Sequence, residues 1–377
     1  MRISFFVFIA IASLIVASAH AGIFFSFVKF FQIGSGPLRK VLLGAMLPLA
    51  FSFIITSMLV HTHENVITRF FYIISAGWLG IFLYLTMATV VCWVVFLVVK
   101  AIGVNVSAVW LTAPIYFVAL LFSLYGFWNA ANPVLKNVTV NIENLPERWK
   151  GRTIVQASDI HLGAINRSGF AQQVVNLINS ANPDVVVITG DLFDGAGEDL
   201  SHLVEPLNQI QAPLGVYFIT GNHETYVGLQ KSFDALQSTK VRMLRDEIVD
   251  LDGVQLVGID YLTIGSPEKL DSIVAQINPA QPSVVLFHEP RFVEVMKKAG
   301  VNLQLAGHTH RGQMWPFNYI TKRVYNGLDY GLYTDGSYNL YTSCGAGTWG
   351  PPLRSGNRPE VVGITLQQIN CLKLESL

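Results

Sequence analysis

The chain has 377 residues and a formal net charge of zero, and 51% of its residues are hydrophobic while 13% are charged. Together with a mean hydropathy of +0.44, this composition excludes an ordinary soluble globular protein. The net charge of zero is the sum of a basic first part and an acidic second part. Residues 1–135 hold six basic residues and one acidic residue, which leaves 19 basic and 24 acidic residues for 136–377. An acidic second part without a basic aromatic groove argues against nucleic acid as a partner.

Four apolar stretches fill the first third of the chain, at residues 3–27, 41–60, 70–99 and 106–128. Each reaches the roughly 20 residues that a helix needs to cross a bilayer. Because unpaired backbone groups cannot face lipid, the stretches predict a transmembrane region of about four helices over residues 1–130. Buried helices of a soluble core are the weaker alternative, since the four stretches follow one another with almost no charge.

The first stretch has a second interpretation. Arg2, an apolar run and Ala19-His20-Ala21 also match a secretory signal peptide with a small-residue cleavage site. The apolar character continues through residues 23–31, which is longer than the usual apolar region of a signal peptide and favours a retained span. We expect a multi-pass membrane protein. The numbers of basic residues on the two sides of the spans are nearly equal, so they do not assign the second part of the chain to either side of the membrane.

The remainder of the chain reads as a linker followed by a layered domain. Residues 131–150 include Pro133 and Pro146 and predict the linker with a first strand at 138–142. From 151 to 377 strand and helix patterns alternate, which predicts an α/β layered domain, and about 240 residues are ample for its core. The expected strands are 153–157, 185–189, 216–220, 284–287 and 303–306, and the expected helices are 170–180, 200–210, 229–237, 270–276 and 292–300. Three later runs, 324–325, 339–343 and 361–366, indicate a second sheet.

Metal-binding residue types follow most of these strands, in five short segments that hold five of the nine histidines. An open sheet forms its site on the loops at strand ends, so carboxylate, imidazole and amide groups are expected to meet there. Such a set predicts two metal ions arranged for hydrolysis. The segments are Asp159-Ile160-His161, Gly190-Asp191, Gly221-Asn222-His223-Glu224, Phe287-His288-Glu289 and Gly307-His308-Thr309-His310.

In this order the segments resemble the calcineurin-like metallophosphoesterases, whose motifs run Asp-x-His, Gly-Asp, Gly-Asn-His-Glu, His and Gly-His-x-His. The resemblance covers residues 152–366, and the tail at 343–348, 351–354 and 358–360 is similar to the small bacterial branch that includes membrane-anchored members. It implies a four-layer α-β-β-α sandwich after the transmembrane region. Arg311 is a departure, because that branch usually has glycine directly after the last histidine.

The resemblance also implies a complete ligand set for two divalent metal ions. The ligands of the first ion are Asp159, His161 and His310, and those of the second are Asn222, His288 and His308, with Asp191 bridging both. Oxygen and imidazole ligands suit Mn, Fe or Zn and exclude an all-thiolate site. A bridging carboxylate lets two ions activate a water between them.

His223 is the expected catalytic residue, because in that family the histidine after asparagine approaches the leaving-group oxygen and is not a ligand. A histidine with a near-neutral pKa can donate a proton there. Glu224 is expected to orient it, as groups around metal sites often do.

Several residues beside the motifs have roles that the sequence leaves open. Asp194 fits a turn or a supporting carboxylate better than a ligand. Arg311 and Arg354 can each contact a substrate phosphate through paired hydrogen bonds or have a structural role. Trp315-Pro316-Phe317 and Trp349 are expected to pack in the core rather than to form an apolar lip.

These observations together predict a membrane-anchored, two-metal phosphoesterase that hydrolyses phosphate ester or pyrophosphate bonds. The anchor favours a lipid-linked or membrane-proximal substrate. The alternatives are a non-catalytic metal-binding membrane sensor or scaffold, and a nuclease or phosphodiesterase acting on soluble substrates. Filled ligand positions favour an enzyme, and a transporter is excluded because the spans contain essentially no ionisable residues.

Overall fold

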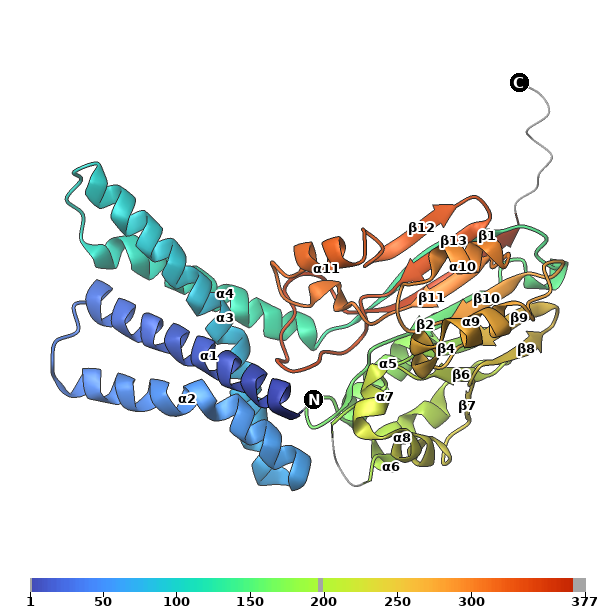
Figure 1. The fold of residues 1–377 in the computed structure, drawn as a ribbon, viewed down its shortest axis with the longest axis horizontal. Coiled ribbons are helices and arrows are strands. Elements are labelled where there is room, and N and C mark those ends of the chain that lie inside the picture. The colour runs from blue at the N-terminus through green and yellow to red at the C-terminus, as the bar shows by residue number, and fades with distance from the viewer. Residues whose placement is uncertain (1, 196–198, 369–377) are drawn as a thin grey trace. The chain divides into compact units, whose positions relative to one another are not determined.

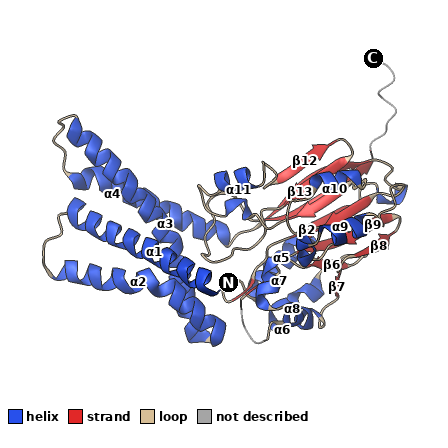
Figure 2. Ribbon diagram, viewed as in Figure 1, coloured by secondary structure: helices blue, strands red, loops and turns tan. Residues whose placement is uncertain are grey.

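A computed structural model describes the backbone of residues 2–195 and 199–368, in the element order of Figure 1. The chain divides into two compact units. One comprises Met1–Trp128 with Gly350–Leu353, and the other comprises Asn129–Trp349 with Arg354–Leu377. Figure 2 shows that the four long helices come first and that all described strands follow them. We call these the helical unit and the sandwich unit.

The helical unit contains four helices, α1 (Arg2–Phe30), α2 (Pro37–Thr62), α3 (Val66–Ala101) and α4 (Ala108–Ala130). Each is long and apolar enough to cross a membrane. The start of α3 is fixed by a capping box, in which the Asn65 side chain accepts a hydrogen bond from the Thr68 N–H and the Thr68 side chain accepts one from the Asn65 N–H. The four predicted helices are therefore present, with ends close to the expected ones.

Polar side chains inside the helical unit have partners within it. The indole of Trp78 donates to Nε2 of His20 at 3.0 Å, and Nδ1 of His20 lies 2.8 Å from the carbonyl oxygen of Val16. The indole of Trp93 donates to the hydroxyl of Ser26 at 2.8 Å. Both ring nitrogens of His20 thus have partners inside the helical unit.

The first sheet of the sandwich unit has six strands in the order β1-β14-β2-β4-β6-β7. All neighbouring strands are parallel except β14 and β2. The first strand starts at residue 134 instead of 138, because it pairs with β14 along its whole length. The strands are β1 (Val134–Ile142), β2 (Thr153–Ala157), β4 (Val185–Thr189), β6 (Val216–Ile219), β7 (Val241–Met243) and β14 (Glu360–Gln368).

The second sheet also has six strands, in the order β12-β13-β11-β10-β9-β8. Its outer pairs, β12 with β13 and β8 with β9, are antiparallel, and its inner pairs are parallel. The strands are β8 (Glu247–Leu251), β9 (Val254–Gly258), β10 (Ser283–Leu286), β11 (Leu303–Ala306), β12 (Gly331–Asp335) and β13 (Tyr338–Thr342). A short parallel pair, β3 (Leu162–Gly163) and β5 (Phe193–Asp194), lies beside the site described below.

Three apolar cores separate four layers, so the sandwich unit is an α-β-β-α sandwich as predicted. Because side chains alternate along a strand, Val186 packs toward the helices while Val187 packs toward the other sheet. On the second sheet, Leu286 faces inward and Val285 faces its own helices. The helices are α5 (Ser168–Ser180), α6 (Ser201–Val204) and α8 (Leu229–Leu236) on the first sheet, and α9 (Pro267–Val274) and α10 (Val293–Lys298) on the second.

Some elements differ from the prediction. The expected helix 200–210 is divided into α6 and a 3₁₀ helix (Glu205–Gln209), because Pro206 stands at the start of the second piece and cannot continue the first. The expected strand at 324–325 is wrong, since these residues end helix α11 (Asn318–Val324), where the N–H of Tyr325 still donates to the carbonyl of Thr321. Strands β7, β8 and β9 were not predicted.

Candidate metal centre

The loops that carry the predicted ligands have an unusual backbone conformation. In the five segments that carry the predicted ligands, five non-glycine residues have positive φ angles between 47° and 70°, a region that side chains rarely adopt and that is concentrated at functional sites. All five are predicted metal ligands: Asp159, His161, Asp191, His308 and His310. The fold therefore directs these side chains toward the strand ends at the expense of backbone strain.

Two glycines let the loops approach one another. A Cβ atom on Gly221 would lie 2.2 Å from Oδ1 of Asp191, and one on Gly307 would lie 2.2 Å from Oδ2 of Asp159. Both distances are too short for real atoms, so only glycine fits. This explains why each glycine comes directly before a ligand in its segment.

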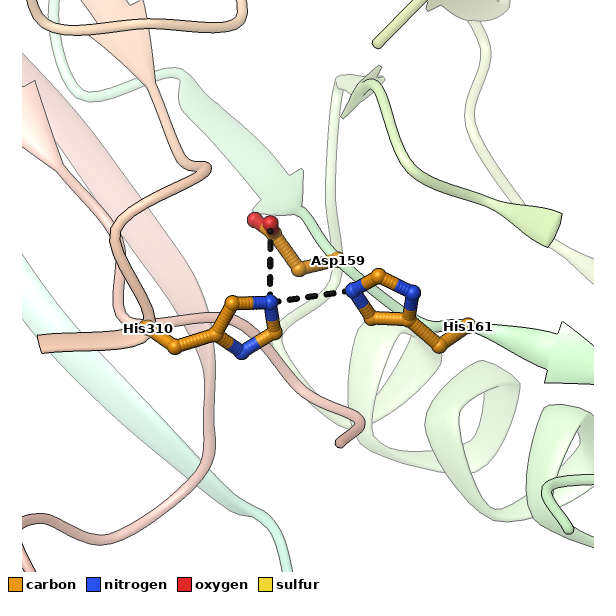
Figure 3. A group of neighbouring side chains, drawn as sticks. All are labelled: Asp159, His161 and His310. Carbon is orange, nitrogen blue, oxygen red and sulfur yellow. Dashed lines mark hydrogen bonds and ion pairs between the residues drawn. The ribbon is translucent and has the colours of Figure 1, made fainter. Parts of the chain in front are cut away.

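The first cluster consists of Asp159, His161 and His310, all buried (Figure 3). The Nε2 atoms of His161 and His310 lie 3.0 Å apart, and Nε2 of His310 lies 3.3 Å from Oδ1 of Asp159. Figure 3 shows the two rings and the carboxylate directed at one another. These three residues are the ones that the sequence assigns to the first ion.

The second cluster combines His288, His308, Asn222 and Asp191. Nε2 of His288 lies 3.2 Å from Oδ2 of Asp191 and 3.2 Å from Oδ1 of Asn222. Nδ1 of His308 lies 2.8 Å from the same Asn222 oxygen. The other ring nitrogen of His288, Nδ1, lies 2.7 Å from the carbonyl oxygen of Thr189, and this contact orients the ring.

Asp191 faces both clusters. Its Oδ2 atom lies 3.9 Å from Nε2 of His161 and 3.2 Å from Nε2 of His288, while its Oδ1 atom accepts the backbone N–H of His223 at 2.9 Å. Burial raises the pKa of Asp191, but His288 and His161 outweigh it, so the pKa lies below its ordinary value. An ionised carboxylate between the clusters is what a bridging ligand requires.

The pKa values of the histidines in the two clusters are shifted in two directions. Burial, helped by His223, lowers the pKa of His161 to about 4, and burial with His288 lowers that of His308 to about 3. At His288 burial also lowers the pKa, but Asp191 and Asp159 outweigh it and raise the value to about 10. The carboxylates thus favour a positive charge within the second cluster, whether a proton or a metal cation supplies it.

His223 lies beside the first cluster without belonging to it. Its ring centroid is 4.5 Å from that of His161, and its Nδ1 atom is 3.2 Å from Oδ1 of Asp194 at the end of β5. Burial lowers the pKa of His223, but the hydrogen bond to Asp194 and the charge of Asp191 raise it above the ordinary value. The supporting carboxylate expected for Asp194 therefore contacts the predicted catalytic histidine.

Glu224 does not orient His223 as the sequence analysis expected. It is fully buried, and its carboxylate accepts backbone N–H groups from Asp191, Leu192, Phe193 and Gly221. Burial and the charge of Asp191 raise the pKa of Glu224 to about 7, although the N–H groups lower it. Glu224 thus joins the two loops that carry Asp191 and Asn222, at the start of α7 (Asn222–Val227).

Arg311 and Arg354, whose roles the sequence leaves open, have different contacts in the structure. Arg354 is fully buried, and its guanidinium donates to the carbonyls of Cys344 and Gly347 and lies 2.7 Å from Nδ1 of His310. Arg354 therefore contacts Nδ1 of His310 and is not among the residues that line the cavity described below. The guanidinium of Arg311 lies 4.5 Å from the ring centre of Tyr330, which is a cation–π contact.

A cavity of about 510 Å³ opens beside the metal centre. Its lining includes residues of the two clusters together with His223. The lining also includes Phe317 and Trp349, which are 36% and 52% exposed, so the expected core packing of these residues is wrong. Tyr226 and residues of α11 also line the cavity, and no periodic or compositional pattern predicts either of them there.

Comparison with known proteins decides the family. A model of the calcineurin-like phosphoesterase family matches residues 152–312. An uncharacterized metallophosphoesterase of Aquifex aeolicus is 32% identical over 259 residues, which cover 67% of this chain and 98% of that protein. The chain belongs to the calcineurin-like metallophosphoesterases.

Two other relatives of this metallophosphoesterase are longer than the matched region. An uncharacterized metallophosphoesterase of Campylobacter jejuni is 34% identical over 256 residues, covering 66% of this chain and 67% of that protein. A transmembrane protein with a metallophosphoesterase domain from Danio rerio is 32% identical over 270 residues, covering 67% of this chain and 61% of that protein. The match thus spans about two thirds of each relative.

The donor chemistry of the site fits metal ions. In each cluster two imidazole nitrogens and a carboxylate oxygen lie within 4.8 Å of one another. The two ring nitrogens of each pair lie 3.0 Å apart in the first cluster and 3.2 Å apart in the second, close enough for one ion to bind both. Nitrogen and oxygen donors without thiolate are typical of Mn, Fe and Zn sites.

Proposed function

We propose that this chain is a membrane-anchored metallophosphoesterase that uses two divalent ions to hydrolyse phosphate ester or pyrophosphate bonds. The observation that carries the proposal is the pair of His/Asp clusters with Asp191 facing both. Mn, Fe or Zn would be held by the two ligand sets, and Asp191 would bridge them. The ligands of the first ion are Asp159, His161 and His310, and those of the second are Asn222, His288 and His308.

Bound ions would supply Lewis acidity and an activated water at the phosphorus atom. His223 would then act on the opposite side of the reaction, at the leaving-group oxygen. Asp194 holds Nδ1 of its ring, which leaves Nε2 to donate a proton. Since Asp194 also raises the pKa of His223, the protonated form needed by a general acid is favoured.

The four membrane-capable helices support a multi-pass membrane location and a lipid-linked or membrane-proximal phosphate as the substrate. An anchored site meets such substrates at a raised effective concentration. A complete ligand set together with His223 favours an enzyme over a metal-binding scaffold.

The test uses the full chain in lipid nanodiscs, supplied with Mn and assayed against a phosphomonoester, a phosphodiester and a lipid pyrophosphate. We expect about two ions per chain and metal-dependent hydrolysis of at least one substrate. His161→Ala should lower both the metal content and the rate. The matched control is His202→Ala, which changes an exposed histidine of the same unit.

A chain that binds two ions yet hydrolyses none of the three substrates would favour the scaffold. Equal metal content in His161→Ala and His202→Ala would show that His161 is not a metal ligand.

A further inference from the structure

Part of the cavity lining outside the metal centre is apolar and exposed to solvent. Helix α11 has no buried residue, and Ile320 on it is 58% exposed although it lines the cavity. Phe317, Tyr325 and Trp349 belong to the same part of the lining. We call these four residues the α11 wall. Side chains of this size normally pack in the core, so their exposure beside a reactive centre indicates a binding surface.

The cavity lining outside the metal centre is uncharged, and its threonine hydroxyls already donate inside the protein. The residues that line the cavity outside the metal centre and His223 carry no charged side chain. The hydroxyl of Thr321 donates to the Asn318 carbonyl and to Asp329 Oδ2, and that of Thr309 donates to the Asp329 carbonyl at 2.6 Å. Because the hydrogen of each hydroxyl is already donated inside the protein, neither hydroxyl is free to donate to a base or a sugar.

The cavity is large enough for a whole small ligand, and it joins the metal centre to the α11 wall. At about 510 Å³ it lies in the range of pockets that hold whole small ligands, which is more space than a phosphate group fills. The same cavity is lined by Asn222, His308 and His310. A molecule whose phosphate reaches these residues therefore places its remaining part against the α11 wall.

We propose that the α11 wall binds the hydrocarbon chain of a phosphate ester whose phosphate lies at the metal centre. This inference rests on the proposed function for its headgroup, and it adds a subsite that selects the ester by its apolar part. Burial of methylene groups against the exposed rings and Ile320 supplies the binding free energy. Each methylene that leaves water should raise kcat/KM about three- to fourfold.

The experiment measures Mn-loaded full chain in nanodiscs with methyl and hexyl p-nitrophenyl phosphate, in which water displaces p-nitrophenolate from phosphorus. We expect kcat/KM for the hexyl ester to exceed that for the methyl ester by about tenfold or more. Ile320→Gln should reduce this ratio several-fold. Leu332→Gln changes an exposed leucine of β12 outside the cavity and should keep the ratio of the unchanged chain.

Equal kcat/KM for the two esters, or an unchanged ratio in Ile320→Gln, would overturn the proposal. A nucleoside p-nitrophenyl phosphate preferred over the hexyl ester would assign the wall to base stacking instead. Calorimetric titration with hexyl phosphate and methyl phosphate separates this idea from the proposed function. Tighter binding of hexyl phosphate that Ile320→Gln abolishes supports the subsite even when no ester is hydrolysed, whereas equal binding overturns it.

Discussion

The carboxylate of Glu224 is the contact whose loss should most clearly damage the metal centre. Each of its oxygens accepts two backbone N–H groups: Oε1 accepts Leu192 and Phe193, and Oε2 accepts Asp191 and Gly221. In Glu224→Gln one oxygen becomes an amide nitrogen, which donates and cannot accept. Two buried N–H groups then lose their acceptor in either orientation of the amide.

The size of the effect follows from this count. A buried N–H without an acceptor costs about 1–3 kcal/mol, so the free energy of unfolding of the sandwich unit should fall by about 2–6 kcal/mol. For a unit of this size each kcal/mol lowers the unfolding temperature by about 2–4 °C. Metal content should fall as well, because the loops of Asp191 and Asn222 lose their common support. Thermal unfolding and elemental analysis of the full chain in nanodiscs measure both quantities.

The matched control is Glu143→Gln, which makes the same chemical change at an exposed position of the same unit. Its unfolding temperature and metal content should stay within error of the unchanged chain. The reasoning is refuted if Glu224→Gln behaves like this control in both measurements.

Three further substitutions separate the roles around the site. Asp191→Asn should lower metal content together with rate, and full occupancy by two ions with normal turnover would contradict a bridging role. His223→Asn should keep both ions and lose about 10²–10⁴ in rate, with a smaller loss for nitrophenolate leaving groups that need no proton. Asp194→Asn should slow the hydrolysis of substrates with poor leaving groups. If Asp194 acts only through His223, the double variant Asp194→Asn/His223→Asn should hydrolyse as fast as His223→Asn alone, and a further loss of rate would give Asp194 an independent role.

The architecture was predictable because its signals are local and strong. Uncharged apolar runs indicate long helices, and buried strands such as Val185–Thr189 are continuous runs of apolar and β-branched residues. The metal centre was predictable for a different reason. Side chains on loops after strands are expected to meet at one edge of the sheets, the family resemblance named seven of them as ligands, and the structure brings all seven together there.

The residues that surround the ligands were harder to assign, because their roles depend on contacts between distant segments. Asp194 contacts His223 across 29 positions of sequence, while Glu224 reaches the loop after β4 instead of its own neighbour. Phe317 and Trp349 look like core residues by composition alone, and only the tertiary structure exposes them to the cavity. Short strands such as β7 carry too few residues for a periodic signal.

The position of β14 has a consequence for how the protein is made. This last described strand lies between β1 and β2, so it fills an inner place in the first sheet, and among the described strands only it pairs with β1. The ribosome releases β1 early, yet residues 360–368 must emerge before β1 can pair. At about 5–20 residues per second, β1 waits on the order of 10 to 40 seconds with its hydrogen-bonding groups unpaired. A chain interrupted shortly before residue 360 would retain all seven predicted ligands and still leave β1 and β2 without β14, open to aggregation and proteolysis.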